Sequence, residues 1–517
     1  MLRPTLHRNV RSLAALMAMS MIVPIAAACS SSDADDPNNR RTLRIGMLYG
    51  SKDNESYFRQ QYTDMFELAH GNIDIELVNA IDYSDSMYES NEERMQKEQP
   101  DPVEKLKEIM TGANPVDVVM LDTGTLGKLV QENLLKPLDP LIKEDKVDLE
   151  AYVPSILDTI REKGNGQLYA LSPTFSASAL FYNKKLFQQA GVGVPTDGMN
   201  WDDVFNLAKR LKSGTGKDAV YGLSLNDWGG GLQFYNVQNI VSPLKLRMFD
   251  DKGEKMTVDT PQWERAWNEP IQLYKDRVIP HQEDLRPEQP ADGNYRYNPY
   301  QERPFFTGRV AMTIGGFSLV NDLITFNQNV DKMKGYEKLD WDVVTYPVLP
   351  EMPDVGPSVY LSELTGISAN AQNPDDAWEF VKFINSKETA KFKARSNYEL
   401  STLKEFIKPR DGSAFNIEAF YKLKPALYES SDAEEKLYRE RPNLSLVNQL
   451  ADLSFQKALS GKMTVKEALA DWQKKGDELL QKIKANPKGE IDMTPYMDNS
   501  GLSPEKEAAM RAAGEIP

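Results

Sequence analysis

The stretch "VDVVMLDTGTLGKLVQENLL" (Val116–Leu135) carries the clearest signal for the fold class. Its first part, Val116 to Asp122, is a short hydrophobic run of the kind found in strands that are buried on both faces of a sheet. Its second part, Thr125 to Leu135, is predicted to be the helix that follows this strand. A buried strand that leads directly into a helix is typical of an α/β fold with a parallel sheet.

The same alternation precedes this stretch, because the residues before it predict two more strands and two more helices. The strands are Thr42–Gly50 and Ile73–Ile81, and the helices are Tyr57–Gly71 and Pro102–Met110. Residues 82–101 are polar and acidic and are predicted to be an exposed insertion. In parallel sheets ligands bind at the carboxyl ends of strands. Tyr49 and the pair Asp122 and Thr123 stand at such ends, so we expect a ligand site there.

Two later helices have recognisable start signals. Asn200 is the expected N-cap of the helix in "NWDDVFNLAKRL", which has acids in its first turn and bases at its end, as the helix dipole favours. Thr260 is the expected cap of a second helix, which begins with Pro261.

Cys29 is the only cysteine in the chain and follows a segment that predicts secretion. Residues 1–28 contain a positively charged start, an apolar run and small residues at a cleavage position. A cysteine directly after such a site resembles a bacterial lipobox, although Ala26 stands where an aliphatic residue is usual. We therefore expect Cys29 to be acylated and residues 29–41 to form a polar tether. The alternatives are a plain secreted protein and a membrane-spanning anchor, but the apolar run is short for a span and contains Pro24.

Composition excludes several classes of function. The net charge of −16 disfavours nucleic acid as a partner. Beyond residue 28 the chain has two histidines, His70 and His281, in unrelated contexts. The motifs of zinc peptidases, α/β-hydrolases, P-loop nucleotidases and dithiol sites do not occur. The sequence therefore predicts no catalytic residue, no metal site and no cofactor.

Several long motifs resemble the family 1 extracellular solute-binding proteins of ABC importers, the maltodextrin-binding-like group. The clearest is "LYALSPTFSASALFYNKKLFQQAGVGVPTDGMNWDDVFNLAKRL" at residues 168–211. Others are "FFTGRVAMTIGGFSLVNDL" at 305–323, "GISANAQNPDDAWEFVKFINSKE" at 366–388 and "ALSGKMTVKEALADWQKKGDELL" at 458–480. The motifs follow the family's order over nearly the whole chain. Residues 82–101 and the tail after about 486 depart from the usual pattern.

The resemblance implies a two-lobe periplasmic-binding-protein-like α/β fold with three inter-lobe crossings and a ligand cleft. We expect the crossings near residues 174–178, 360–366 and, less sharply defined, 405–425. The expected N-terminal lobe comprises residues 42–175 and 362–415. The expected C-terminal lobe comprises residues 176–361 and 416–486, and 487–517 form a C-terminal extension.

The cleft expected from the resemblance should combine aromatic rings with polar side chains, as a sugar site requires. Trp228 lies in the glycine-rich turn "NDWGGG", and Gly316 and Phe317 lie in the turn "GGF" that matches the family's glycine-aromatic turn. The other candidates are at or near the first two crossings, namely Phe175, Ser176, Tyr360 and Glu363. Each of these side chains could instead pack in the core or cap a helix.

The resemblance implies a monomeric, lipid-anchored protein on the outer face of the cytoplasmic membrane, which captures an oligosaccharide by closure and delivers it to ABC permease subunits. Three alternatives stay open: a binding protein for a non-sugar solute, a sensor that presents solute to a receptor kinase, and a glycoside-degrading enzyme. The last would use two carboxylates such as Asp122 and Glu363 as acid and base.

Overall fold

The computed structural model of the 517-residue chain describes residues 40–97, 99–228, 231–285, 298–356, 359–396, 398–409, 412–426 and 432–497. Cys29, the tether before residue 40 and the end of the C-terminal extension lie outside these ranges. Among the residues that the structure describes, none of the helices is both long and apolar enough to cross a membrane.

The first sheet has five strands in the order β2-β1-β3-β12-β4. Their bounds are β1 (Arg41–Gly50), β2 (Ile73–Asp82), β3 (Val118–Leu121), β4 (Ala170–Leu171) and β12 (Leu364–Ile367). Strand β1 pairs in parallel with β2 and β3, as the alternating sequence predicted, while β12 runs antiparallel to β3. All four residues of β3 are buried, which confirms the interpretation of this strand.

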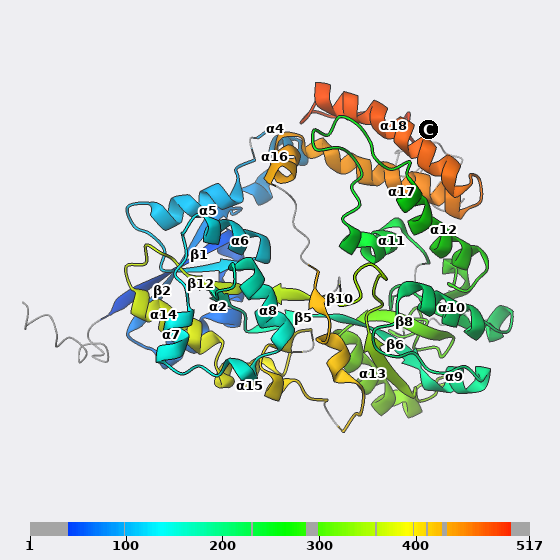
Figure 1. Cartoon of the computed structure of the whole chain (residues 1–517), viewed down its shortest axis with the longest axis horizontal. Helices are drawn as coiled ribbons and strands as arrows, with labels where there is room; N and C mark the ends of the chain where they lie inside the picture. The colour runs from blue at the N-terminus through cyan, green and yellow to red at the C-terminus, as the bar shows by residue number, and fades with distance from the viewer. Residues whose placement is uncertain are drawn as a thin grey trace, which may run out of the picture.

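Nine helices accompany the first sheet in the described part of the chain (Figure 1). They are α2 (Lys52–Tyr62), α3 (Asp64–Ala69), α4 (Asn91–Gln96), α5 (Pro102–Thr111), α6 (Thr123–Gln131), α7 (Asp139–Glu144), α8 (Pro154–Lys163), α14 (Pro374–Ile384) and α15 (Lys387–Lys393). The single helix expected over 57–71 is instead two helices. Thr63 lies between the two helices with a φ of −116°, and its fully buried side chain donates a hydrogen bond to Glu67.

The second sheet has four strands in the order β7-β8-β6-β9. Their bounds are β6 (Ser178–Asn183), β7 (Tyr221–Ser224), β8 (Val310–Gly316) and β9 (Trp341–Thr345). The helices on this side of the molecule are α9 (Lys184–Ala190), α10 (Trp201–Leu211), α11 (Phe234–Val241), α12 (Pro261–Lys275), α13 (Ser318–Asn329), α16 (Asp432–Glu440), α17 (Leu446–Leu459) and α18 (Val465–Ala485). The predicted caps of α10 and α12 are confirmed, because Asn200 and Thr260 accept hydrogen bonds from Asp203 N and Trp263 N.

Short 3-10 helices join these elements. They are η1 (Ser86–Tyr88), η2 (Leu149–Ala151), η3 (Gly216–Asp218), η4 (Ser242–Leu244), η5 (Gln282–Leu285), η6 (Val330–Lys332), η7 (Lys404–Phe406), η8 (Ile417–Phe420) and η9 (Pro442–Ser445). Two further strands, β10 (Val355–Gly356) and β14 (Lys424–Pro425), pair in parallel with each other.

The molecule has two hydrophobic cores, which lie on opposite faces of the second sheet. One face of β6 places Ala179 and Phe181 in a core that continues to the first sheet and its helices. The other face places Leu180 and Tyr182 in a separate core with the helices α10, α12, α17 and α18. The alternation of side chains along a strand therefore assigns neighbouring residues to different cores.

A small three-stranded sheet connects the two larger ones. It consists of β5 (Thr174–Ser176), β11 (Tyr360–Ser362) and β13 (Leu400–Ser401), with β5 in the centre. The chain passes from β4 of the first sheet through β5 into β6 of the second, and it returns through β11 into β12. After β13 it reaches η8, which packs against β6 and β9. These passages give the two-lobe architecture that was predicted.

Candidate functional site

The carboxyl ends of β1, β2 and β3 form one edge of the first sheet. Tyr49 at the end of β1 and Tyr83 just after β2 stack with their ring centres 5.9 Å apart and their planes 11° apart. Both rings keep much of their surface exposed, and partial burial raises the pKa of Tyr49, with Tyr83 and Asp122 adding to the effect. The edge therefore presents an aromatic pair beside a carboxylate.

Asp122 has a local structural role at this edge. Its Oδ1 accepts a hydrogen bond of 2.7 Å from Thr125 N, so it caps helix α6. The residue is nevertheless exposed, and Thr123, the first residue of α6, is half-buried. A carboxylate that caps a helix still has lone pairs to accept hydrogen bonds from a ligand.

Glu363 lies at the same edge, because β12 runs antiparallel to β3 and begins beside its end. Its φ of +38° is unusual for a residue other than glycine and marks the sharp turn from β11 into β12. Burial raises the pKa of Glu363, Glu399 raises it further and Lys393 opposes them. Glu399 accepts a 2.7 Å hydrogen bond from Thr174 of β5. A polar cluster therefore lies at the junction of the connecting strands and the first sheet.

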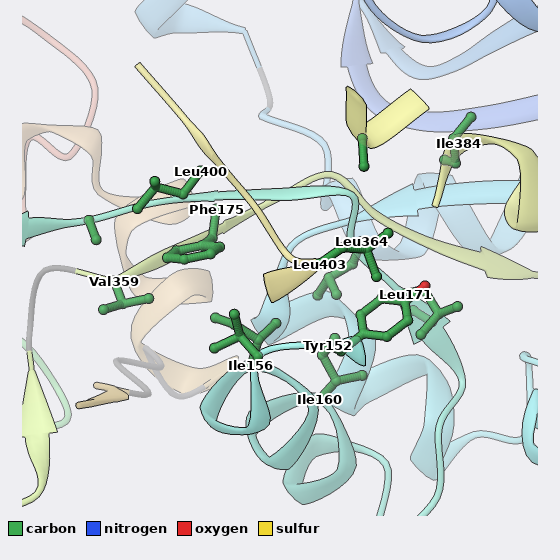
Figure 2. Packing of buried hydrophobic residues seen from close by; sticks show 14 of the residues in the cluster. Tyr152, Ile156, Ile160, Leu171, Phe175, Val359, Leu364, Ile384, Leu400 and Leu403 are labelled. Carbon is green, nitrogen blue, oxygen red and sulfur yellow. The ribbon is translucent and has the colours of Figure 1, made fainter. Parts of the chain in front are cut away.

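The connecting sheet has two different faces. Ser176 pairs with Tyr360, whereas Phe175 pairs with Leu361 and Leu400. Phe175 is fully buried in the core, as Figure 2 shows for its packing near Leu400. Tyr360 is 65% exposed. The sequence predicted that Phe175 and Ser176 both face the ligand. Ser176 is partly exposed, but Phe175 lies in the core and cannot contact a solute.

A cavity of about 260 Å³ opens at the edge of the second sheet. The ends of β7, β8 and β9 and the start of β6 meet at this edge, since β6 is antiparallel to β8 and β9. The polar side chains around the cavity are Ser178, Asn236, Asn239, Ser242, Tyr346 and Tyr360. Tyr360 thus extends from the connecting strand to the edge of the second sheet.

A larger cavity of about 560 Å³ adjoins the first and shares Tyr360, Asn239 and Ser242 with it. One wall is α8, which belongs to the first core, and the opposite wall is α11 and η4, which accompany the second. Its polar residues are Asp158, Thr159, Glu162, Gln238, Asn239, Ser242, Lys245, Tyr360 and Lys424. Apolar side chains such as Val241, Leu246 and Trp263 complete the lining. The two lobes therefore enclose an amphipathic space.

Trp228 lines neither of these two cavities. It follows β7 by four residues and is 70% exposed. The guanidinium carbon of Arg303 lies 4.6 Å from the centre of its ring. Gly316 ends β8 and lies opposite Ser178 of β6. The next residue, Phe317, is 5% exposed and packs edge-on against Phe420, with the two ring centres 5.4 Å apart. The ring of Phe317 is thus in the core, whereas Trp228 has a free surface.

The structure brings together most of the expected site residues in two places. Tyr49, Asp122, Thr123 and Glu363 share the edge of the first sheet, and Ser176, Gly316 and Tyr360 adjoin the second. Tyr83, Asn239 and Ser242 lie in the same two places and were not among the predicted residues. Tyr83 could have been found from the carboxyl-end rule, since it follows the predicted strand at 73–81. Helix α11, which carries Asn239, has amides at positions 236, 238 and 239 among mostly apolar residues.

The chemistry of the region is that of a binding site. Within the residues described, no group of three or more His, Cys, Asp or Glu side chains is arranged to hold a metal ion. Amides, hydroxyls and charged groups alternate with aromatic and aliphatic surface around the larger cavity. Such a lining can hydrogen-bond a polar solute and cover its apolar faces.

Comparison with protein families gives the class of this protein. The model of the family "Bacterial extracellular solute-binding protein" matches residues 50–391, which is more than half of the chain. The chain belongs to this family. Its members are solute-binding proteins of ABC importers that act outside the cytoplasm. They are binding proteins, and the resemblance inferred from the sequence is confirmed.

Individual relatives are distant. A putative binding protein from Brucella abortus is 24% identical over 323 residues, which cover 60% of this chain and 70% of that protein. A maltotriose-binding protein from Pyrococcus abyssi is 23% identical over 292 residues, 56% of this chain and 55% of that protein. Among solved structures, a sugar transporter from Rhizobium etli in an open conformation has a TM-score of 0.50 at 20% identity. This likeness covers 85% of our chain and 99% of that one, and it shows the fold alone.

Proposed function

We propose that this protein captures a carbohydrate, an oligosaccharide rather than a monosaccharide, between its lobes and delivers it to an ABC permease. The observation that carries the proposal is the 560 Å³ cavity that α8 and the segment α11–η4 enclose from opposite lobes. Tyr360 contributes an exposed ring to its lining, together with the amides of Gln238 and Asn239 and the hydroxyl of Ser242.

The lining favours a neutral solute. Asp158 and Glu162 on α8 balance Lys245 and Lys424 on the other walls, so the cavity has no excess of either charge. A polyamine would be expected to meet a surplus of carboxylates, and a sugar phosphate a surplus of cations. Hydroxyl and amide groups beside an aromatic ring are the groups that a sugar needs, because its hydroxyls require hydrogen bonds and its C–H faces require apolar contact.

Capture would proceed by closure. The lobes are connected by short strands, and a solute that touches both lobes binds the closed arrangement better than the open one. We retain Tyr49, Asp122, Thr123, Ser176, Trp228, Tyr360 and Glu363 as solute-contacting candidates. Phe175 and Phe317 are not retained, because their rings have almost no exposed surface.

The location we propose is the outer face of the cytoplasmic membrane. Acylation of Cys29 would anchor the chain, and the polar tether up to residue 41 would let the lobes reach the permease. We keep the lobe bounds given above, residues 42–175 with 362–415 and 176–361 with 416–486, as part of the proposal. We also propose that the protein acts as a monomer.

A screen of melting temperature tests the solute class. The purified protein is heated with a series of neutral oligosaccharides that includes maltotriose, with glucose, with a sugar phosphate and with spermidine. A ligand that binds only the native state raises the melting temperature by mass action. We expect the largest rise with a neutral oligosaccharide. A rise only with spermidine or the sugar phosphate would refute the carbohydrate assignment.

A further inference from the structure

Helix α16 is firmly attached to the C-terminal core. Leu437 in its middle is 7% exposed and belongs to that core. Gly253 lies directly beneath it with a φ of +59°, and a Cβ at this position would lie 2.9 Å from Leu437 Cδ2. Arg441, just beyond the helix, donates a 3.0 Å hydrogen bond to the carbonyl of Lys252. The helix therefore moves with the C-terminal lobe.

The charged side chains of α16 nevertheless pair with the N-terminal lobe. Lys128 of α6 places its Nζ 2.8 Å from Asp432 Oδ1 and 2.7 Å from Glu435 Oε2. One turn further along α16, Arg439 pairs with Asp101, the residue that caps α5. Three ion pairs thus join the beginning and the end of α16 to two neighbouring helices of the other lobe.

These contacts are separate from the three crossings. In Figure 1, α16 lies at the top of the molecule beside α5 and α6, whereas the connecting strand β5 lies well below it. Lys488, three residues after the end of α18, adds a 3.3 Å hydrogen bond from its Nζ to the carbonyl oxygen of Lys97. The lobes are therefore connected at two distant places. At one the chain itself passes between them through β5, β11 and β13, and at the other they are joined by side-chain contacts of α16 and Lys488.

The charges of α16 also reach the expected ligand edge. Burial is the main cause of the raised pKa of Tyr49, and Glu435 adds to it while Arg439 opposes it. Burial lowers the pKa of Lys128, but its hydrogen bonds to Asp432 and Glu435 outweigh that effect and leave the pKa raised. Lys128 is thus held in its charged form, and its partner Glu435 is close enough to Tyr49 to affect the pKa of that residue.

We propose that Lys128 is a positioning residue for solute capture. Together with the pair of Asp101 and Arg439, it holds α16 as a strap between the C-terminal lobe and helices α5 and α6 of the N-terminal lobe, and so favours the closed arrangement of the lobes. Its effect on solute binding rests on the proposed function, whereas its effect on the distance between the lobes does not. Exposed ion pairs are individually weak and are screened by salt. The strap can therefore open whenever the lobes exchange solute.

The test measures the distance between the lobes in the absence of solute. Lys143 of α7 and Lys466 of α18 are exposed, and both are changed to cysteine in a Cys29→Ser chain so that two dyes can be attached. Energy transfer between the dyes should be high at low ionic strength and should fall at 0.5 M salt. Lys128→Met should give low energy transfer at every salt concentration. At low ionic strength its closed form should be about fivefold less populated than that of the parent.

Lys107→Met is the matched control. Lys107 is as shielded as Lys128 and also pairs with two carboxylates, Glu104 and Glu132, but all three residues lie on the N-terminal lobe. This variant should behave like the parent, and the double variant Asp432→Asn, Glu435→Gln should behave like Lys128→Met. Parent-like transfer and salt response in Lys128→Met would overturn the proposal. A loss of energy transfer in Lys107→Met as large as that in Lys128→Met would also overturn it. A protein that binds no sugar but retains the salt-dependent distance would refute only the proposed function.

Discussion

The guanidinium group of Arg303 lies against one face of the indole ring of Trp228, with its central carbon 4.6 Å from the ring centre. The arginine is 4% exposed, and its guanidinium carbon also lies 4.4 Å from the centre of the Phe306 ring. Its Nη1 lies 2.6 Å from Asp322 Oδ2, and Asp227 accepts from Nη2. The indole thus rests against a buried guanidinium group, while Trp228 as a whole is 70% exposed.

This support predicts that Trp228 is a preformed surface for a sugar ring. Trp228→Ala should weaken binding of the selected sugar by about 1–3 kcal/mol, as expected for the loss of an aromatic contact to the solute. Calorimetric titration measures the change. Trp228→Phe, which keeps a smaller ring, should lose less affinity.

Arg303 should act through Trp228 alone. Arg303→Lys keeps the charge but loses the planar group that stacks on the indole. In the parent this change should weaken sugar binding and make the indole fluorescence easier to quench, whereas in Trp228→Ala it should have no further effect on affinity. Equal losses of affinity in both backgrounds would show that Arg303 supports the fold and not the indole.

Tyr360 should be the most sensitive position in the cavity, because it lines both cavities and joins the lobes. Tyr360→Ala should reduce sugar affinity by roughly 1–3 kcal/mol, whereas Tyr360→Phe should lose only the hydroxyl's hydrogen bond of about 1 kcal/mol. Titration calorimetry again gives the values. Tyr88→Ala is the control, since Tyr88 is 84% exposed and lines none of the described cavities. An unchanged affinity in Tyr360→Ala would place the site elsewhere.

The polar cluster around Glu363 predicts a pH-dependent stability. Burial first and Glu399 second raise the pKa of Glu363, so the folded state favours its neutral form; Lys393 opposes this shift and Asp122 adds to it. A raised pKa stabilises the fold at a pH below the ordinary value of 4.5, and this contribution is lost as the pH rises through the raised value. Gln is neutral at every pH, so Glu363→Gln should gain stability relative to the parent between pH 4 and pH 7.

Melting temperatures at the two pH values check this prediction. Glu144→Gln, at an exposed position of α7, is the control and should follow the parent at both. If the difference in melting temperature between Glu363→Gln and the parent is the same at pH 4 and pH 7, the carboxylate of Glu363 is solvated in the folded protein and the prediction is wrong.

Cys29 should determine the location of the protein. Cys29→Ser removes the thiol that acylation requires, and the protein should then appear in the soluble extracellular fraction, because two acyl chains are needed for stable anchoring. Fractionation of cells followed by immunoblotting measures this. Retention of the Ser variant in the membrane fraction would show that another element anchors the chain.

The sequence was sufficient for the alternation of strands and helices and for the edge of the first sheet. Strand β3 has an uninterrupted hydrophobic run, and the family motifs fix the order of the remaining elements. It was less informative about which face of a short strand meets the cleft. In β5, Ser176 and Phe175 differ by one position, and only the pairing with β11 and β13 shows that Phe175 points into the core.

Tertiary packing explains the other differences. Phe317 follows two glycines, which suggested an exposed ring, but Phe420 from the distant segment η8 covers it. Asn239 and Ser242 were not predicted for the opposite reason, since amides in a mostly apolar helix and a hydroxyl just after it are unremarkable until a cavity is found beside them. Both cases depend on contacts between residues more than 100 positions apart, which local patterns do not encode.

Small-angle X-ray scattering tests the central claim, that the lobes capture a solute by closing on it. The purified protein is measured alone and with a saturating concentration of the oligosaccharide that raises its melting temperature most. Closure should reduce the radius of gyration, and Tyr360→Ala should need more sugar to reach the same value. An identical radius of gyration in the free and the saturated protein would contradict the account.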